Sequence, residues 1–372
     1  MIKIYIITER RADYSRFRPI LNLIKEDDQL DYILTATGAH LKKEMGYTKN
    51  EIINDGFKIH YEIDMFTEIN DSGGAMVRAF SRVADKITHT LEESKPDIIL
   101  AGFDIGANLA ATIAGAHMNI PVAHIQGGEV TGTIDESIRH AMSKFSHYHF
   151  ASNEDAKERL IKLGELSQNI FNVGCPSIDA IMNTEDDQSI LKKFDLIEED
   201  YFILLQHPVT SEFENSKEQI LITIAALKKT KVNVLIILPN NDAGHSKIIK
   251  ELKNSNFKFV ESLNLNQYVN LLKRSSGLIG NSSSGIHETS SFDIPTINIG
   301  TRQMGRLRPK NVIDVNHNEE EIKNAIQECI TIKKNKIQFE NPYGDGKSSK
   351  KILDIIKKLD LSKNIIQKRI TY

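Results

Sequence analysis

The stretch "PVAHIQGGEVTGTIDESIRHAMSKFSHYHFAS" spans residues 121–152 and carries one full cycle of the pattern that decides the fold. An apolar run (121–128) ends in two glycines, a helix-like run follows at 136–145, and a second apolar run begins at 147. Strands that alternate with helices in this way pair in parallel through right-handed crossovers. The stretch therefore predicts a parallel α/β sheet, and many titratable residues follow its first apolar run in the sequence.

About twelve short apolar runs, rich in β-branched residues, recur along the chain and are typical of strands buried on both faces. They divide into two sets of about six, which predicts two doubly wound domains with a boundary near Ser177. A basic amphipathic pattern at 348–370 predicts a C-terminal packing helix with a solvated lysine face. The predicted strands cover residues 3–8, 32–38, 97–102, 121–128, 147–152 and 170–174, then 201–208, 232–239, 257–262, 277–283, 295–300 and 311–315.

Composition narrows the class of protein. The chain has 372 residues, and its 47 basic and 50 acidic side chains give a net charge of -3, which argues against a general nucleic-acid binder. No apolar run approaches the roughly 20 residues that span a bilayer, and the first residues lack the features of a signal peptide. Two cysteines, Cys175 and Cys329, offer no metal-binding spacing and suit a reducing cytoplasm. We therefore expect a cytoplasmic protein without nucleic-acid or membrane partners.

A serine-rich segment, "GNSSSGIHETSSF" (280–292), follows a predicted strand and leads into a helix expected to start near Gly285 or Ile286. Backbone N–H groups and the Ser282 and Ser283 hydroxyls suit phosphate oxygens, and Glu288 could accept a hydrogen bond from a ribose hydroxyl. The alternative is that these serines only cap the helix. No GxxxxGK[ST] or GxGxxG motif occurs, so neither common nucleotide fingerprint is present.

Arginines offer a second set of anion-binding candidates. Arg11 and Arg16 follow the first strand, and Arg302 lies in "GTRQMGR" (300–306). Guanidinium groups bind phosphate in a bidentate manner. The alternatives are a solvated helix face for the first two and a loop salt bridge for Arg302.

Acid–base chemistry requires groups whose pKa values are pushed apart by their environments. Asp104, Asp135 and Glu136 are the candidate carboxylates, and His207 after "ILLQ" is a candidate for polarising a phosphate or moving a proton. Local sequence alone favours a helix N-cap for Asp135 and a structural hydrogen bond for His207. His140, His147 and His149 lack a completing carboxylate or cysteine, so no metal site is predicted.

Taken together, the motifs resemble the UDP-N-acetylglucosamine 2-epimerases, and within them the hydrolysing branch that feeds sialic-acid-type nonulosonate synthesis. The resemblance covers nearly the whole chain, and its motifs occur in one order at consistent spacing. They are "RADYSRFRP" (11–19), "TGAHLKKEMGYT" (37–48), "HIQGGEVTGTIDESIRHAMSKFSHYHF" (124–150), "VGCPSID" (173–179), "QHPVT" (206–210), "PNNDAG" (239–244) and "GNSSSGIHE" with "GTRQMGR" (280–306).

This resemblance implies the GT-B fold: two Rossmann-like domains, 1–177 and 178–355, with the active site in the cleft between them and a C-terminal helix at about 356–372 packing back on the first domain. It implies a UDP- or GDP-linked sugar as partner, a homodimer or homotetramer, and no cofactor or metal. The implied catalytic group comprises Asp104, Asp135, Gln126, Glu136 and His207. The implied substrate-binding group comprises Arg11, Arg16, His40, Asp179, His207, Asn240, Ser282, Ser283, Glu288 and Arg302.

The implied reaction removes the C2 proton of an N-acetylated sugar while the nucleoside diphosphate leaves C1, which gives a glycal. Water then adds at C1, a proton returns to the opposite face of C2, and the free 2-epimer is released. The alternatives are a non-hydrolysing 2-epimerase, a glycosyltransferase of the same fold, and a nucleotide-sugar sensor that has lost its acid.

Three departures from the family pattern bear on the substrate. The chain reads "ERR" (9–11) where the family commonly has "GTR", and "FDI" (103–105) where it commonly has "GDR". It also carries Gln126 where a glutamate proposed as catalytic is common. An amide is no general base at neutral pH, so Gln126 is expected to orient the sugar or a water. The departures favour a modified sugar, such as a 2,4-diacetamido-6-deoxy sugar, or a different nucleotide.

Overall fold

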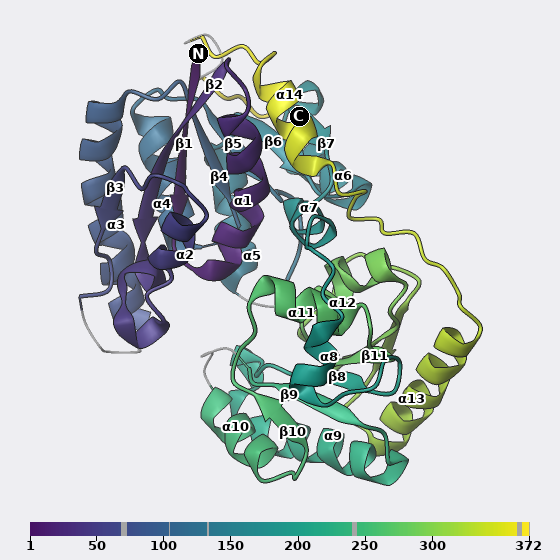
Figure 1. The fold of residues 1–372 in the computed structure, drawn as a ribbon. Helices are drawn as coiled ribbons and strands as arrows, with labels where there is room; N and C mark the ends of the chain where they lie inside the picture. The colour runs from purple at the N-terminus through teal and green to yellow at the C-terminus, as the bar shows by residue number, and fades with distance from the viewer. Residues whose placement is uncertain (68–72, 104, 132–133, 240–243, 363–366, 372) are drawn as a thin grey trace. The chain divides into compact units, whose positions relative to one another are not determined.

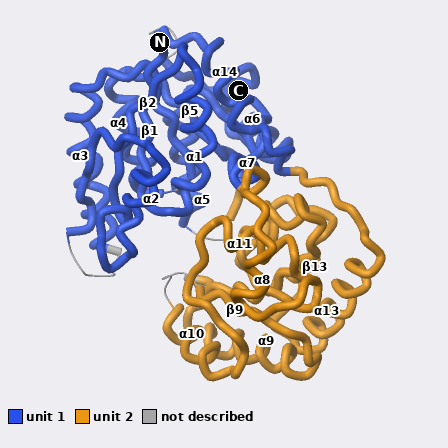
Figure 2. Tube along the Cα trace, in the orientation of Figure 1, with its two compact units in different colours: residues 1–129, 134–180, 343–372 blue, residues 130–133, 181–342 orange. Residues whose placement is uncertain are grey.

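The chain divides into two compact units, which Figure 2 distinguishes by colour. Unit 1 comprises Met1–Glu129, Ile134–Ala180 and Tyr343–Tyr372, and unit 2 comprises Val130–Thr133 and Ile181–Pro342. The computed structural model describes residues 1–67, 73–103, 105–131, 134–239, 244–362 and 367–371. The predicted domain limits, 1–177 and 178–355, stay a prediction.

Unit 1 is built on a seven-stranded sheet in which all pairings are parallel (Figure 1). The strand order is β3-β2-β1-β4-β5-β6-β7. The first strand of the chain, β1, lies inside the sheet between β2 and β4. Later strands are added outward from it in both directions, as in a doubly wound sheet. The strands are β1 (Ile2–Thr8), β2 (Leu30–Thr37), β3 (Tyr61–Ile63), β4 (Ile98–Gly102), β5 (Val122–Ile125), β6 (Tyr148–Ala151) and β7 (Ile170–Asn172).

Helices cover both faces of this sheet and bury its alternate side chains. One face packs Ile4 and Ile6 against Phe17 and Ile20 of α1, and the other packs Tyr5 and its neighbours against α3, α4 and α5. The helices of unit 1 are α1 (Arg11–Lys25), α2 (Lys49–Asn54), α3 (Gly73–Ser94), α4 (Gly106–His117), α5 (Ile134–Phe145), α6 (Glu154–Lys162), α7 (Pro176–Met182, which runs into unit 2) and α14 (Ser348–Ile356).

The last helix, α14, belongs to unit 1 although it comes after all of unit 2 in the chain. It lies beside α1 and buries Ile352, Leu353 and Ile356 in the same cluster as Phe17 (Figure 1). The structure places this helix at Ser348–Ile356 rather than at about 356–372. The described residues beyond it, 357–362 and 367–371, form no helix, although Leu359 and Leu361 still pack against the same cluster.

Unit 2 contains a six-stranded parallel sheet of order β10-β9-β8-β11-β12-β13. One face packs against α9, α10 and α13, and the other against α8 and α11. The strands are β8 (Phe202–Leu205), β9 (Val234–Ile237), β10 (Lys258–Val260), β11 (Gly277–Gly280), β12 (Thr296–Ile299) and β13 (Val312–Val315). The helices are α8 (Ser189–Phe194), α9 (Ser216–Thr230), α10 (His245–Lys253), α11 (Leu265–Leu272), α12 (Ser284–His287) and α13 (Glu319–Lys334).

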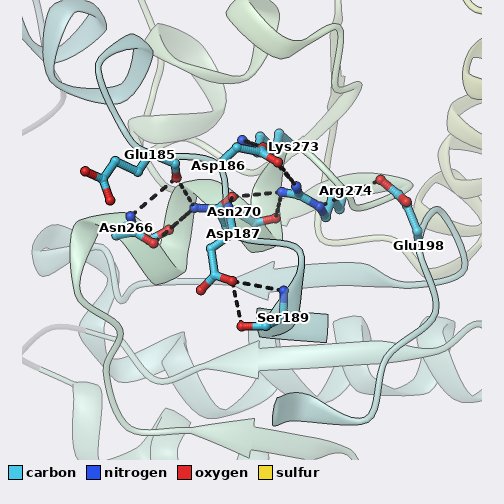
Figure 3. A network of polar contacts seen from close by, with 9 residues as sticks. All are labelled: Glu185, Asp186, Asp187, Ser189, Glu198, Asn266, Asn270, Lys273 and Arg274. Carbon is cyan, nitrogen blue, oxygen red and sulfur yellow. Dashed lines mark hydrogen bonds and ion pairs between the residues drawn. The ribbon is translucent and has the colours of Figure 1, made fainter. Parts of the chain in front are cut away.

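A polar network fixes the segment that leads into α8 against α11 (Figure 3). Arg274 donates to both carboxylate oxygens of Asp186, at 2.9 and 2.8 Å, and to Asn270 Oδ1 at 2.8 Å. Asn270 donates to the Glu185 carbonyl at 2.8 Å and accepts from the Asp187 N–H at 2.8 Å. The network therefore joins this segment to α11 by side-chain hydrogen bonds.

All twelve predicted strands are present in the structure, in the predicted division of six and six, and β3 is an additional edge strand. The α/β fold class with two doubly wound parallel sheets is confirmed. Within the described ranges, no helix has the length and apolar character needed to cross a membrane.

Candidate functional site

In unit 1, the carboxyl end of β1 forms a tight turn held by one carboxylate. Asp13 accepts hydrogen bonds from Thr8 Oγ1 at 2.8 Å and from the backbone N–H groups of Glu9 and Arg10 at 2.8 and 2.9 Å. His40 joins the same cluster, with Nε2 3.0 Å from Thr8 Oγ1 and Nδ1 2.7 Å from Thr48 Oγ1. Burial lowers the pKa of His40, and its ring bridges Thr8 at the end of β1 and Thr48 at the N-cap of α2.

Glu9 fills the position just after β1. Its Oε2 accepts from the N–H of Ala107 in the first turn of α4 at 3.1 Å. Burial raises the pKa of this carboxyl group, although the Arg10 charge acts in the opposite direction. The chain therefore places its own acid at the N-terminus of α4, where an external anion would otherwise be favoured.

Gln126 follows β5, and its side chain lies between Arg16 and Cys175 of unit 1. Its Oε1 accepts from Arg16 Nη1 at 3.2 Å, and its Nε2 lies 2.8 Å from Cys175 Sγ. The Arg16 guanidinium also lies over the Phe103 ring, 5.0 Å from its centroid. Burial raises the pKa of Cys175 to about 11, so the thiol is protonated and inert as a nucleophile.

The first turn of α5 presents two of the candidate carboxylates, Asp135 and Glu136. Glu136 Oε1 lies 3.6 Å from His140 Nε2, one helical turn later. The pKa of His140 is lowered chiefly by burial, and the Glu136 charge opposes that shift. Carboxylates in a first helical turn interact favourably with the positive end of the helix dipole.

Asp179 has a role that local sequence could not reveal. Its two carboxylate oxygens accept from the backbone N–H groups of Ser348 at 3.0 Å and Ser349 at 2.6 Å, at the start of α14. The side chain is buried, and its two hydrogen bonds cap this helix.

Arg11 in α1 lies 3.8 Å from Glu51, which is consistent with a surface ion pair.

In unit 2, His207 lies just beyond the end of β8 and forms two hydrogen bonds with Asn281. The His207 N–H donates to Asn281 Oδ1 at 2.7 Å, and Asn281 Nδ2 donates back to the His207 carbonyl at 2.8 Å. Arg302 and Gln303 both donate to the Asn281 carbonyl, at 3.2 and 2.8 Å. Burial, followed by the Arg302 charge, lowers the pKa of His207 to about 3.

The serine-rich loop follows β11 and begins with Gly280. Gly280 has a φ of 131°, and an added Cβ would lie 2.1 Å from the Leu205 carbonyl oxygen, so only glycine fits. Ser282 Oγ accepts from the Ser284 N–H at 3.3 Å, which supports the capping alternative for that residue. Ser283 occupies the N-cap position of α12 without a side-chain capping bond.

Glu288 is hydrogen-bonded to a neighbouring hydroxyl. Its Oε2 accepts from Ser284 Oγ at 2.6 Å, and Ser284 in turn contacts the Tyr268 hydroxyl. Burial raises the pKa of Tyr268, so the phenol is protonated. The helix α12 begins at Ser284, one residue before the earlier of the two predicted starts.

The structure thus gathers the candidates at the carboxyl ends of strands within each unit. His40, Arg16 and Gln126 surround the ends of β1, β2 and β5, and His207 and Arg302 meet at Asn281 beside β8 and β11. Asp104 and Asn240 lie outside the described residues. Asp13 and Asn281 were not predicted; Asn281 directly follows β11, and Asp13 lies in the first turn of α1. Among the described residues, no group of three or more His, Cys, Asp or Glu side chains could hold a metal ion.

Comparison with known proteins gives a consistent result. The profile of the family described as UDP-N-acetylglucosamine 2-epimerase matches residues 22–357. The chain is 36% identical to UDP-N,N'-diacetylbacillosamine 2-epimerase (hydrolyzing) of Legionella pneumophila over 98% of each chain. It is 35% identical to the GDP/UDP-N,N'-diacetylbacillosamine 2-epimerase (hydrolyzing) of Campylobacter jejuni over 85% of each.

Solved structures agree on the fold. The crystal structure of UDP-GlcNAc 2-epimerase from Neisseria meningitidis bound to UDP-GlcNAc is similar with a TM-score of 0.84 and 21% identity, over 96% of this chain and 100% of that one. This likeness confirms two parallel-sheet α/β units of the GT-B type. By the extent of the sequence match, the chain belongs to the UDP-N-acetylglucosamine 2-epimerase family.

Proposed function

We propose that this protein is a hydrolysing nucleotide-sugar 2-epimerase that acts on a UDP- or GDP-linked 2,4-diacetamido sugar and releases the free 2-epimer. The observation that carries the proposal is the identity of 36% with a hydrolysing diacetylbacillosamine 2-epimerase over 98% of both chains. A relative named for UDP-N-acetylglucosamine, from Neisseria meningitidis, is 32% identical. The higher identity to the diacetamido-sugar enzymes favours that sugar class.

Unit 2 is proposed to bind the nucleoside diphosphate. Ser283 at the N-cap of α12 and the Arg302 guanidinium beside Asn281 supply donors of the kind that phosphate oxygens accept. Glu288 is proposed to accept from a ribose hydroxyl, together with Asn240, which the sequence places in the "PNNDAG" motif. Arg11 and Arg16 of unit 1 are proposed to add positive charge for the leaving diphosphate.

Unit 1 is proposed to supply the acid–base groups. A carboxylate, Asp104 or Asp135, takes the C2 proton, and the C2–H electron pair forms the C1=C2 bond of a glycal. The C1–O bond breaks, and the nucleoside diphosphate leaves with the electron pair of that C1–O bond. Water then adds its oxygen to C1, and a second group returns a proton to the opposite face of C2. Glu136 and His207 are proposed to assist proton movement, and Gln126 and His40 to orient the sugar. Asp179 is proposed to support the sugar end of the site.

The test is incubation of the full chain in D2O with UDP- and GDP-linked 2,4-diacetamido sugars and with UDP-GlcNAc, followed by NMR of the products. The proposal expects free nucleoside diphosphate and a free 2-epimer that carries one deuterium at C2. A product that keeps its nucleotide linkage would contradict the hydrolysing step and indicate a non-hydrolysing epimerase. Turnover only with an added sugar acceptor would indicate a glycosyltransferase instead.

Two variants separate chemistry from binding. Asp135→Asn is expected to lower turnover by about 10²- to 10⁴-fold, as for loss of a general acid or base, while UDP binding measured by calorimetry persists. Asp155→Asn serves as a matched control, because that partly exposed carboxylate lies in the first turn of another helix, α6, where it pairs with Arg159. Full turnover by Asp135→Asn would remove this residue from the mechanism.

A further inference from the structure

Among the described residues after α14, Lys357, Asp360 and Lys368 each contact other parts of unit 1. Lys357 forms an ion pair with Asp27 beyond the end of α1, at 2.7 Å. The Tyr148 hydroxyl donates to the Asp360 carbonyl at 2.5 Å. Lys368 makes the third attachment, beyond residue 357, where the match to the family profile ends. This tail, residues 357–362 and 367–371, is therefore an ordered part of unit 1.

Lys368 makes the most concentrated set of contacts in the tail. Its Nζ donates to the carbonyls of Ser143 and Lys144, at 2.9 and 3.0 Å, and lies 2.6 Å from Glu165 Oε2. Those two carbonyls belong to the last turn of α5, whose terminal carbonyls lack partners within the helix. An ammonium group at this end also complements the helix dipole.

Glu165 connects the tail to the buried interior of unit 1. Its side chain is 2% exposed, and besides Lys368 it contacts Lys144 Nζ at 2.8 Å and His149 Nε2 at 3.0 Å. Burial would raise the pKa of Glu165, but its hydrogen bonds and charge contacts with His149, Lys144 and Lys368 prevail and lower it to about 2. The buried carboxylate thus depends on these partners, and Lys368 joins it to α5.

The other end of the same helix carries the proposed acid–base groups. The 12 residues of α5 extend for roughly 18 Å, with Asp135 and Glu136 in the first turn. Between the ends, Arg139 Nη1 donates to the Glu129 carbonyl at 3.0 Å, and Ser143 Oγ lies 3.1 Å from His124 Nδ1. Because α5 is one continuous helix, a shift at its C-terminal turn displaces the first turn as well.

We propose that Lys368 is a positioning residue: by joining the last carbonyls of α5 to Glu165, it fixes the place at which this helix presents Asp135 and Glu136 to the substrate. The inference rests on the proposed role of those two carboxylates. It assigns the tail a part in turnover, in addition to its contribution to stability.

The tail contains its own matched control. Lys357 and Lys368 both form a lysine–carboxylate pair that ties the tail to unit 1, but only Lys368 contacts α5. Lys368→Met is expected to lower kcat by about 5- to 100-fold, the range expected for misplacement of catalytic groups by about 1 Å, with KM changed less than about 2-fold. Lys368→Arg is expected to restore most of kcat, and Lys357→Met to leave kcat unchanged.

Amide hydrogen exchange of α5 supplies a readout that does not require activity. Lys368→Met is expected to speed exchange in the last turn of α5 relative to Lys357→Met. Equal losses of kcat in the two variants, or an unchanged kcat in Lys368→Met, would overturn the positioning role. Should Lys368→Met fail to fold, Lys368→Gln, which keeps a donor without the charge, is expected to show a smaller fall in kcat. An inactive wild type would contradict the proposed function, while the exchange experiment would still test whether Lys368 anchors α5.

Discussion

Arg16 donates a hydrogen bond of 3.2 Å to Gln126 across 110 positions of the chain. Gln126 is 5% exposed, adopts a positive φ of 63°, and directs its amide nitrogen at the protonated Cys175 thiol. Among the described residues, Arg16 forms no ion pair. A neutral amide at position 126 therefore holds the guanidinium in place and leaves its positive charge uncompensated.

We predict that Gln126→Glu weakens substrate binding, because the new carboxylate neutralises Arg16. If Arg16 contacts the diphosphate, loss of one charge-assisted bond, about 1.5–3 kcal/mol, raises KM about 10- to 100-fold. Steady-state kinetics with the nucleotide sugar measures this. Arg16→Met should show a similar increase in KM, whereas Gln126→Leu, which keeps the charge, should show a smaller one. An unchanged KM in Gln126→Glu would show that the Arg16 charge does not act on the substrate.

Asp179 offers a prediction that separates a structural role from a binding role. Asp179→Ala leaves two buried N–H groups at the start of α14 without their acceptor, which we expect to lower the free energy of unfolding by about 1–3 kcal/mol. Asp179→Asn keeps one acceptor and should lose less. Urea unfolding followed by circular dichroism measures both. A KM that rises in Asp179→Asn without loss of stability would favour the sugar contact that the resemblance implies.

Strands were the part of the fold that local sequence could predict. Twelve runs were recognisable because parallel strands buried on both faces need continuous apolar residues. The edge strand β3 escaped notice because it has three residues, of which only Ile63 is buried. The amphipathic pattern at 348–370 starts the C-terminal helix at the correct residue but extends it too far, because its lysine-rich continuation resembles a helix face; the helix ends at Ile356.

Site residues could be predicted only as far as the rule that ligands collect beyond strand ends. Gln126, His207 and the serine-rich loop fit that rule, because the structure places them just after β5, β8 and β11. Contacts between distant segments could not be read from the sequence. Asp179 caps a helix 169 positions later, and Lys368 reaches the carbonyl of Ser143, 225 positions earlier.

The network of Figure 3 yields a prediction about stability. Arg274 and Lys273 are neighbours that both pair with Asp186, but the Arg274 side chain is only 4% exposed, against 21% for Lys273. Arg274→Met removes the buried hydrogen bond to Asn270 Oδ1 and the two charge-assisted hydrogen bonds to Asp186, and is expected to cost about 1–3 kcal/mol in unfolding free energy. Lys273→Met, the matched control, is expected to cost less than about 1 kcal/mol. If chemical unfolding shows that Arg274→Met and Lys273→Met lower the free energy of unfolding equally, the buried hydrogen bonds of Arg274 do not contribute the stability assigned to them.

His207 provides a test of how unit 2 responds to pH and to nucleotide. Its pKa of about 3 lies below the ordinary value of 6.5, so the folded state resists a proton that the unfolded state accepts. The free energy of unfolding that this pKa difference contributes is fully present above about pH 6.5. It decreases as the pH falls toward 3, by up to about 1.4 kcal/mol per pH unit. His207→Asn should remove this dependence from the unfolding of unit 2.

The same histidine should report on bound phosphate. An anion near the imidazole stabilises its charged form, so UDP is expected to raise the pKa of His207, as seen by NMR titration of labelled histidine. Arg302→Met should also raise it in the free protein, because a repelling charge is removed. His317, which is part of the same unit and has its pKa lowered by burial, is the internal control and should not move with UDP. A His207 resonance that titrates near pH 6.5 without UDP would refute the burial argument, and one insensitive to UDP would place the diphosphate elsewhere.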